Sequence, residues 1–301
     1  MATPRLPLTP TSKWGDLMIL RVILRALPYA LRWSNKYIKD LWTNRFLRHL
    51  PSAITEFCTT LTYKGIRLQI NTGENSGRKI FYFGEYERVQ EEVFLAMVPD
   101  RKVFDIGPNI GIFSLLAASR GAKVFAFEPS RMVRVQLELN ITLNAFGERI
   151  TIVPEAVSDS EGMIHFFETR NDNWGIGRIF SYGHSAGKLN DYVVPTKTLD
   201  HFISELGMPD IVKIDIEGAE WLALKGAPST LADRHAPDFL IEFHPGEIAT
   251  LGGSMERCIE QLLESGFTQY QLRNSLRGAS RHSWFVFSKR ELSSPVLRSM
   301  C

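Results

Sequence analysis

Residues 102–119 constrain the fold of this chain more than any other segment. Lys102–Ile106 combines β-branched and aromatic residues and stops at Gly107, and a helical pattern begins at Ile112. Glycines at a strand-to-helix turn let the backbone approach a ligand closely. In an open α/β sheet such turns lie beyond the carboxyl ends of the strands, where ligands bind. The segment therefore predicts an α/β protein with a ligand-binding loop.

The residue types in this loop indicate which ligand it suits. A dinucleotide fingerprint would need glycine where Asn109 and Ile112 stand, so that pattern fails. The acidic Asp105 at the strand end would repel a phosphate and suits an ammonium group. The spacing D-x-G-x-N-x-G, which also includes Gly107 and Gly111, resembles the first motif of S-adenosylmethionine-dependent methyltransferases. In those enzymes the acidic residue helps to hold the methionine amino group. A tight turn without a ligand is the alternative.

The next strand–turn–helix unit fits the same ligand. Lys123–Glu128 is a second strand that ends in a carboxylate, 17 positions after Gly111. A carboxylate there is placed to accept both ribose hydroxyl protons, as in NAD sites. Pro129 and Ser130 then open a helix over 131–144, with Ser130 as its N-cap. We include Pro129 with the cofactor-binding residues.

A third strand is predicted at Ile150–Val153, and its following turn contains Glu155 and Ala156. By analogy this turn lies beside the adenine ring, where small or polar residues can cap the edge of the base. An ordinary exposed loop explains each of the two residues equally well. The segment 163–168 after this turn has a strand pattern in place of the helix that a simple Rossmann half would contain.

Acidic residues and a histidine gather at the ends of two later strands. Asp215 and Glu217 lie at the end of the strand Ile211–Ile216, in which apolar and charged residues alternate, and Glu242 and His244 end the apolar strand that starts at Phe239. Parallel strands would present these four side chains at the sheet edge that carries loop 107–111, the predicted cofactor loop. A functional role for at least two of them is our interpretation. The alternative for Lys213, which shares one face of the first strand with Asp215, is a pairing with Glu242 inside the sheet.

Several motifs together resemble the FkbM family of methyltransferases, from about Gly84 to His244 and more loosely to Phe287. The motifs are DIGPNIG (105–111), FEPS (127–130), AVSDSEG (156–162), KIDIEGAE (213–220) and IEFHP (241–245). Pro108 stands where the family commonly has Ala. The resemblance implies a doubly wound, Rossmann-like class I sheet of seven strands with the last antiparallel. It also implies methyl transfer from S-adenosyl-L-methionine, most often to a hydroxyl of a sugar or secondary metabolite, and a contact of Glu87 with the methionine end of the cofactor.

Methyl transfer to a hydroxyl requires alignment, desolvation and removal of one proton. His244 has an ordinary pKa of about 6.5, which suits a general base. Asp215 is the alternative base or orients the acceptor, with Glu217 nearby. A divalent cation held by Asp215, Glu217, Glu242 and His244 would be a second route, which would favour magnesium or manganese. We rank metal-free base catalysis first and assign no metal site.

Composition and charge place the chain among enzymes of ordinary size. The 301 residues include 44% hydrophobic ones, enough for one large α/β core with an extension. Residues 51–271 carry 20 basic and 30 acidic side chains, which argues against a nucleic-acid substrate. Cys58, Cys258 and Cys301 lack metal-ligand spacing and indicate free thiols in a reducing compartment, so we expect a cytoplasmic protein.

We predict four regions. Residues 1–50 form a basic helical extension, 51–95 a small β cap and lead-in helix, 96–290 the methyltransferase domain and 291–301 a tail. The cap includes strand patterns at 59–63, 66–70 and 79–82.

The N-terminal extension has an amphipathic helical pattern over 14–42. Five Lys or Arg residues lie on one narrow stripe, and Pro28 should kink or divide the helix. The basic residues interrupt any run long enough for a membrane span or a secretory leader. The segment either lies on the inner face of an anionic membrane or packs on the catalytic body or a second copy, and we favour packing slightly.

Other functions stay open at this point. A catalytically silent protein that binds S-adenosylmethionine as a partner would retain the cofactor loop but would have no use for a base. Transfer to nitrogen would need the same cofactor site. An NAD-dependent oxidoreductase is disfavoured by the failed dinucleotide pattern. The identity of the small-molecule or glycan acceptor and the oligomeric state are not readable from the sequence.

Overall fold

The structure is a computed structural model, and it describes residues 56–169, 177–179, 189–272 and 283–291. The predicted helix over 14–42 and the tail at 292–301 lie outside these ranges. The chain divides into two compact units. One holds the chain up to Leu61 together with Ile70–Tyr86, and the other holds Thr62–Gln69 and everything from Glu87 onward. None of the helices in the described ranges has the length and apolar character needed to cross a membrane.

The N-terminal part contains a small sheet and one helix. Strands β1 (Cys58–Tyr63) and β2 (Ile66–Asn71) pair with each other, and helix α4 (Asn75–Phe83) follows. The strand predicted at 79–82 is therefore wrong. A short apolar run cannot distinguish a strand from a buried helix, and here Ser76, Gly77 and Ile80 share one buried helical face. Gly84, with φ of +67°, ends the helix in the left-handed conformation.

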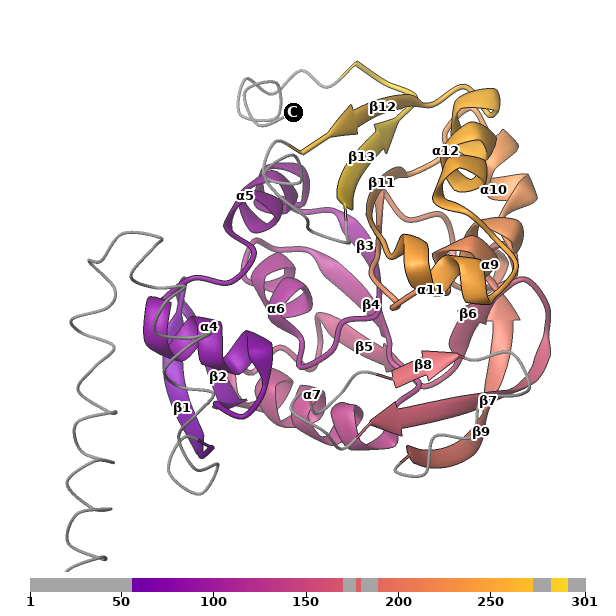
Figure 1. The fold of residues 1–301 in the computed structure, drawn as a ribbon. Coiled ribbons are helices and arrows are strands. Elements are labelled where there is room, and N and C mark those ends of the chain that lie inside the picture. Colours follow the sequence, from indigo (N-terminus) through magenta and orange to yellow (C-terminus); the bar gives the residue numbers. More distant parts are fainter. Residues whose placement is uncertain (1–55, 170–176, 180–188, 273–282, 292–301) are drawn as a thin grey trace, which may run out of the picture. The chain divides into compact units, whose positions relative to one another are not determined.

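The large unit is built on a sheet of seven strands (Figure 1). Its spatial order is β12-β13-β11-β10-β3-β4-β5, and β13 is antiparallel to both of its neighbours. The prediction of a doubly wound sheet with an antiparallel last strand is confirmed. The strands are β3 (Lys102–Ile106), β4 (Lys123–Phe127), β5 (Ile150–Val153), β10 (Ile211–Ile214), β11 (Asp238–Phe243), β12 (Thr268–Gln271) and β13 (Ser283–Ser288).

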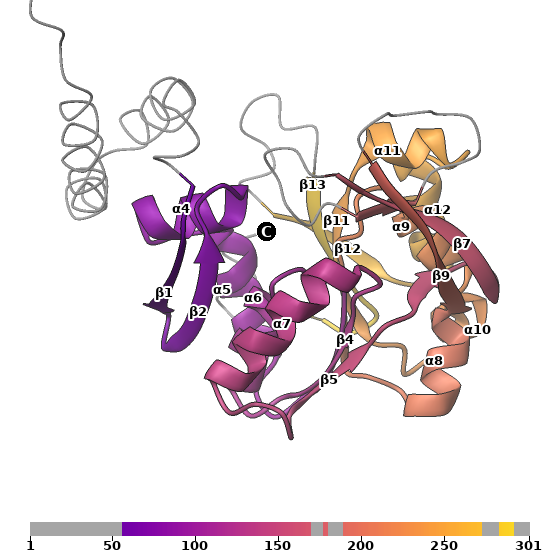
Figure 2. The same cartoon turned by 90° about the horizontal axis from the view of Figure 1, so that it is seen from below.

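Helices cover both faces of this sheet. Figure 2 shows α5, α6 and α7 on one side of β4 and β5, and α8, α9, α10 and α12 on the other. Side-chain N-caps start three of them, because Ser130, Thr198 and Ser254 each accept a backbone N–H of the first turn. The helices are α5 (Arg88–Met97), α6 (Ile112–Ala118), α7 (Arg131–Leu143), α8 (Leu199–Leu206), α9 (Glu220–Lys225), α10 (Pro228–Ala232), α11 (Pro245–Thr250) and α12 (Met255–Glu264).

A second, four-stranded sheet is inserted between β5 and α8. It contains β6 (Ala156–Ser158), β7 (Gly162–Thr169), β8 (Gly177–Ile179) and β9 (Leu189–Thr198), in the order β6-β9-β7-β8. The strand predicted at 163–168 is thus confirmed. Tyr192 of β9 accepts a hydrogen bond from the backbone N–H of Arg131, which ties this sheet to the start of α7.

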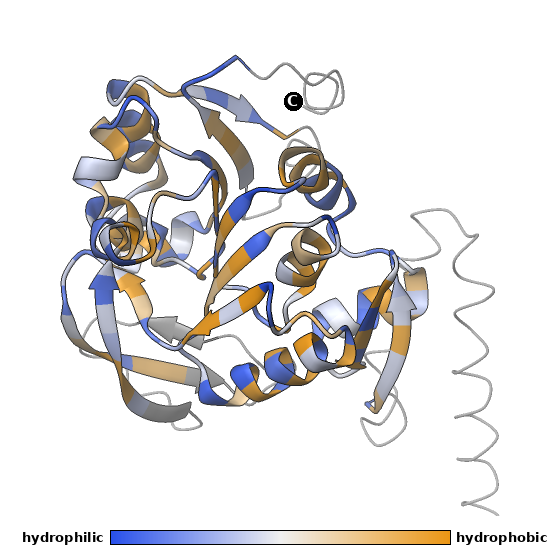
Figure 3. Ribbon diagram, turned by 180° about the vertical axis from the view of Figure 1, so that it is seen from behind, coloured by the Kyte–Doolittle hydropathy of each residue, from blue (hydrophilic) through white to orange (hydrophobic). Residues whose placement is uncertain are grey.

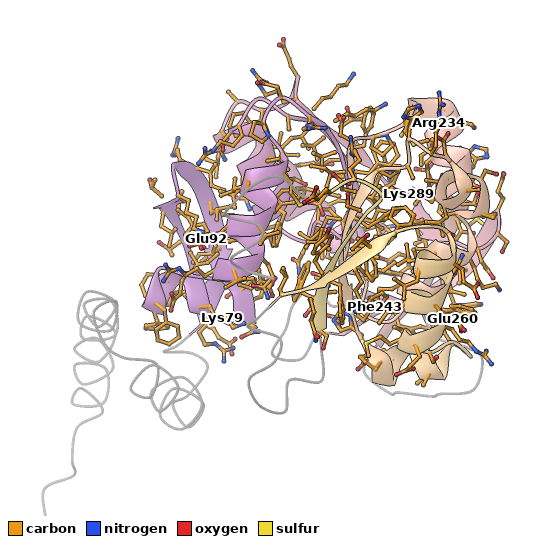
Figure 4. The ribbon with its side chains drawn as sticks, turned by 90° about the horizontal axis from the view of Figure 1, so that it is seen from above. Lys79, Glu92, Arg234, Phe243, Glu260 and Lys289 are labelled. Atoms are coloured by element: carbon orange, nitrogen blue, oxygen red, sulfur yellow. The ribbon has the colours of Figure 1, made fainter. Side chains whose placement is uncertain are left out.

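Aromatic side chains fill the core beneath the strand ends. Phe104 of β3 packs edge to face on Phe125 and at a tilt on Phe127, both of β4, and Phe202 of α8 packs edge to face on Phe127. Figure 3 shows the central strands of the large sheet as mostly hydrophobic with isolated hydrophilic positions. Phe243 of β11 is fully buried, whereas Glu260 of α12 is exposed at the outer side (Figure 4). Among the described residues, the buried Asp105, Glu128 and His244 lie at or just beyond the carboxyl ends of β3, β4 and β11.

Candidate active site

The loop between β3 and α6 has the tight geometry that its glycines predict. Gly107 has φ of +80°, and a Cβ atom there would lie 1.9 Å from the carbonyl oxygen of Asp215. Asn109 takes the left-handed conformation with φ of +53°, and its side-chain oxygen accepts the N–H of Ile110. Such backbone strain is typical of functional sites. The loop is therefore held in one shape against the turn that follows β10.

Asp105 is fully buried beneath this loop. Its Oδ2 accepts a hydrogen bond from the Ser114 hydroxyl at 2.6 Å, and its Oδ1 lies 3.2 Å from the Nζ of Lys213. Lys213 also donates to the Gly107 carbonyl at 2.8 Å. In this structure Asp105 thus anchors the loop from below. Its contact with a methionine amino group stays a prediction.

Lys213 has other partners than the one considered from the sequence. It lies beside Leu240 in the sheet register, and its Nζ is 3.6 Å from Oδ2 of Asp215. Burial alone would lower the pKa of Lys213, but the charges of Asp105 and Asp215 outweigh it and raise that pKa. Lys213 is therefore a buried ammonium between the cofactor loop and the acidic strand end, and the alternative pairing with Glu242 is wrong.

Glu128 is placed directly after β4, at the same edge. Its Oε1 accepts the backbone N–H of Ser130 at 2.9 Å, and a backbone hydrogen bond from Asn109 reaches the same carboxyl group. Burial raises the pKa of Glu128 to about 8, against the lowering effect of these hydrogen bonds. Glu128 therefore links the turn after β4 to the cofactor loop.

The remaining predicted cofactor residues are spread along the edge. Pro129 and Glu155 are half-buried in the turns after β4 and β5, and Ala156 is buried at the start of β6. Glu87 is half-buried immediately before α5, and its charge acts on both Lys213 and Glu242. Gly111 forms the N-cap of α6 with φ of +94°.

The four predicted catalytic residues do come together. The Nε2 atom of His244 lies 3.8 Å from Oε2 of Glu217, 4.0 Å from Oδ1 of Asp215 and 4.0 Å from Oε2 of Glu242. His244 is almost fully buried, whereas the side chains of Asp215, Glu217 and Glu242 keep 21%, 26% and 12% of their exposure. His244 is thus the most buried member of this cluster, and Asp215 and Glu217 are its most exposed acids.

Protonation in this cluster differs from what free side chains would show. Burial, the charges of Asp215, Glu87 and Glu217, and a hydrogen bond with Asp215 raise the pKa of Glu242 to about 11. Burial would lower the pKa of His244, but the hydrogen bond to Glu220 and the surrounding carboxylates raise it to about 9. At neutral pH, Glu242 is therefore a neutral acid and His244 an imidazolium. The ordinary histidine pKa used in the sequence argument does not apply here.

Sequence reasoning did not single out Glu220, which the structure places against His244. This side chain is fully buried, and its Oε1 lies 2.9 Å from Nδ1 of His244. Its position in the KIDIEGAE motif was the available signal, but an acid at a helix start is also explained by the helix dipole.

Two kinds of ligand fit this donor set. Asp215, Glu242 and His244 each offer an atom within 4.8 Å of the others, a spacing open to a divalent cation as well as to a shared proton. The glycine loop 107–111 with the buried Glu128 fits a nucleoside, because glycine lets the backbone approach a ligand closely and a carboxyl group at the end of the second strand can accept ribose hydroxyl protons. The edge as a whole carries more carboxylates than cations, which favours a positively charged ligand.

Comparison with known proteins identifies relatives of this arrangement. The sequence profile described as the Methyltransferase FkbM domain matches residues 105–268, which is more than half of the chain. The AMB antimetabolite synthetase AmbE of Pseudomonas aeruginosa is 26% identical over 249 residues, covering 67% of this chain and 12% of AmbE. The hexuronic acid methyltransferase AglP of Haloferax volcanii is 28% identical over 151 residues, covering 49% of this chain and 57% of AglP.

The chain thus spans only part of each curated relative. Among solved structures, the methyltransferase FkbM of Methylobacillus flagellatus aligns with a TM-score of 0.42 and 17% identity, covering 91% of this chain and 60% of that one.

Proposed function

This chain belongs to the FkbM methyltransferase family, and from that premise we propose that it transfers the methyl group of S-adenosylmethionine to a hydroxyl of a sugar, glycan or secondary metabolite. One observation supports this most: the cofactor loop and the Asp215 cluster meet at one sheet edge, with Lys213 in contact with both. The names of the two curated relatives, a hexuronic acid methyltransferase and an antimetabolite synthetase, favour an acceptor of this class.

The residues of the edge divide into those that would hold the cofactor and those that would act on the acceptor. The loop 107–111 and Glu128 would hold the nucleoside and the methionine part, with Asp105 supporting the loop from below. When bound, S-adenosylmethionine supplies an electrophilic methyl group on a cationic sulfur. The chain itself must orient the acceptor oxygen, exclude water and remove one proton.

Asp215 is the proton acceptor that the geometry favours. His244 is buried and already an imidazolium at neutral pH, so it is a poor base there. Asp215 lies at the exposed side of the cluster, with Nζ of Lys213 at 3.6 Å and Nε2 of His244 at 4.0 Å from its carboxylate oxygens. Asp215 would take the hydroxyl proton, while Glu217 would orient the acceptor. We therefore place Asp215 ahead of His244 as the base.

Ligand-induced stabilisation tests the cofactor assignment. S-adenosylhomocysteine should raise the melting temperature of the full chain, and NAD should not. Glu128→Gln should weaken S-adenosylhomocysteine binding about 10- to 100-fold, because a carboxamide cannot accept from two hydroxyls as a carboxylate does. Glu138→Gln, on the exposed side of α7, is the matched control and should bind as the parent protein does. Stabilisation by NAD alone would reject the proposal.

A second measurement tests transfer. Labelled S-adenosylmethionine should pass its methyl group to at least one member of a panel of uronic acids, neutral sugars and hydroxylated metabolites. Asp215→Asn should abolish the transfer and keep cofactor binding. Tight binding without transfer to any acceptor would indicate a silent binding protein, and a methylated amine would indicate transfer to nitrogen.

A further inference from the structure

A single buried carboxylate oxygen holds together two elements of the candidate site. Oε1 of Glu220, at the start of α9, lies 3.0 Å from the backbone nitrogen of Gly218 and 3.3 Å from that of Ile216. The same oxygen lies 2.9 Å from Nδ1 of His244, which is 24 residues further along the chain. One atom therefore contacts both the turn after β10 and the end of β11.

The hydrogen-bond pattern fixes the direction of the contact with the ring. Backbone N–H groups can only donate, so Oε1 of Glu220 acts as an acceptor toward Ile216 and Gly218. A carboxylate oxygen that accepts from its neighbours requires that Nδ1 of His244 be the donor. The proton on Nδ1 is thereby assigned, and Nε2 is the ring atom that faces the open edge.

The turn held by Glu220 carries the two most exposed acids of the cluster. Glu217 has φ of +53° and Gly218 has φ of +108°, so the turn is in a conformation that needs support. A Cβ atom on Gly218 would lie 2.4 Å from Cβ of Glu247, which shows how closely α11 packs here. The backbone bonds from Ile216 and Gly218 to Glu220 supply support from the other side.

His244 lies close to four acids, which come from the turn after β10, from α9 and from β11. Asp215 and Glu217 face it from the turn after β10, Glu220 from α9 and Glu242 from β11. Its Nδ1 contacts Glu220 at hydrogen-bond distance, while its Nε2 lies 3.8–4.0 Å from the other three. The orientation of the imidazole ring therefore decides which carboxylate lies nearest to each of its nitrogen atoms.

We propose that Glu220 is a positioning residue for methyl transfer, which fixes the ring orientation of His244 and the turn of Asp215 and Glu217 so that Nε2 is directed at these carboxylates. The inference rests on the proposed function in one respect, since the site that Glu220 orders is taken to be the transfer site. The carboxylate–histidine pairing itself does not depend on the reaction. Similar pairings orient histidines in hydrolase triads and metal sites.

Nitrogen-15 NMR of the His244 ring tests the pairing without any substrate. The conservative variant Glu220→Gln keeps an oxygen for the two backbone donors but removes the charge, so the titration midpoint of His244 should fall by about one pH unit or more. The matched control is Glu91→Gln. Glu91 is also fully buried, on α5, and accepts from Tyr63 at 2.7 Å, so its variant should leave the His244 signal unchanged.

Kinetics with an accepted substrate form the second readout. Glu220→Gln should lower kcat roughly 100-fold or more and shift the pH–rate profile, while KM for S-adenosylmethionine changes less than threefold. Glu91→Gln should retain the parent kcat. Thermal melting verifies that both variants fold, and His244→Asn, which removes the ring, should give a kcat loss that does not add to that of Glu220→Gln.

The outcomes separate this inference from the proposed function. An unchanged His244 titration in Glu220→Gln overturns the inference, and so does a changed titration with an unchanged kcat. A changed titration in a protein that methylates no acceptor upholds the pairing and rejects the proposed function.

Discussion

Lys213 of β10 and Asp105 of β3 form a buried ion pair across neighbouring parallel strands, with 3.2 Å between Nζ and Oδ1. The two residues are partners in the sheet register, and both are at most 1% exposed. Lys213 then reaches the Gly107 carbonyl and Asp215, so one ammonium joins the cofactor loop to the proposed base. A buried charge of this kind destabilises the folded protein when its oppositely charged partner is removed.

Removal of this ammonium should destabilise the fold. Lys213→Met leaves Asp105 as an unpaired buried charge, and we expect a loss of about 3–5 kcal/mol in the free energy of unfolding. Denaturant titration measures it. Lys225→Met is the matched control, because its partner Asp159 is in an exposed pair and the expected change is below about 1 kcal/mol.

A double variant identifies the cause of this loss of stability. Adding Asp105→Asn to Lys213→Met removes the unpaired charge and should restore part of the stability. A double variant no more stable than Lys213→Met alone would contradict the charge argument and would point to lost packing instead.

Gly107→Ala should abolish cofactor binding. The new Cβ atom would lie 1.9 Å from the Asp215 carbonyl and would also have to accept φ of +80°. Gly65→Ala separates the two effects, because Gly65 has φ of +88° with nothing within 4 Å of the added atom. We expect the control to cost about 1–2 kcal/mol of stability and to retain binding of S-adenosylhomocysteine, measured by calorimetry. Binding by Gly107→Ala would show that the loop can relax.

The fold and the meeting of the site residues could be predicted because local pattern determines them. Buried parallel strands are continuous apolar runs, and Lys102–Ile106 ends at a glycine that forces a turn. Since the carboxyl ends of parallel strands share one edge, Asp215 and His244 had to lie near each other once both strands were identified. The strand predicted at 79–82 failed because it is too short for its periodicity to be distinctive.

Protonation and the role of Glu220 could not be read from the sequence. The pKa of His244 depends on burial and on three acids, Glu220, Asp215 and Glu217, whose distances from the ring only the folded chain sets. Glu220 contacts His244, 24 residues further along the chain, after a turn in which Glu217 and Gly218 both have positive φ. Lys213 likewise lies opposite Asp105 in the sheet register, whereas the sequence pattern offered Glu242 as its alternative partner.

Affinity for S-adenosylhomocysteine should rise with pH. Glu128 ionises near pH 4.5 in the unfolded chain and near 8 in the folded protein, so its contribution to stability declines as pH rises through that window. A ligand whose ribose hydroxyls donate to the carboxylate favours the ionised form. The Kd should therefore fall from pH 6 to 8, by up to about tenfold per pH unit, and level off above 8.

Calorimetry at several pH values measures this trend, with Glu128→Gln as the variant that should flatten it. A Kd that does not depend on pH in the parent protein, or a slope that survives in Glu128→Gln, would assign the ribose contact to another group.

Transferase activity should survive the removal of divalent cations. Asp215, Glu242 and His244 are close enough to hold one, but a hydrogen bond already joins Asp215 to Glu242, and His244 supplies positive charge at the same place. A cation would have to displace that proton and the imidazolium charge, which disfavours binding near neutral pH. Dialysis against EDTA should leave the initial rate within about twofold, and added magnesium or manganese should not raise it. A rate that falls after dialysis and returns only with one of these cations would establish the metal route in place of direct proton transfer to Asp215.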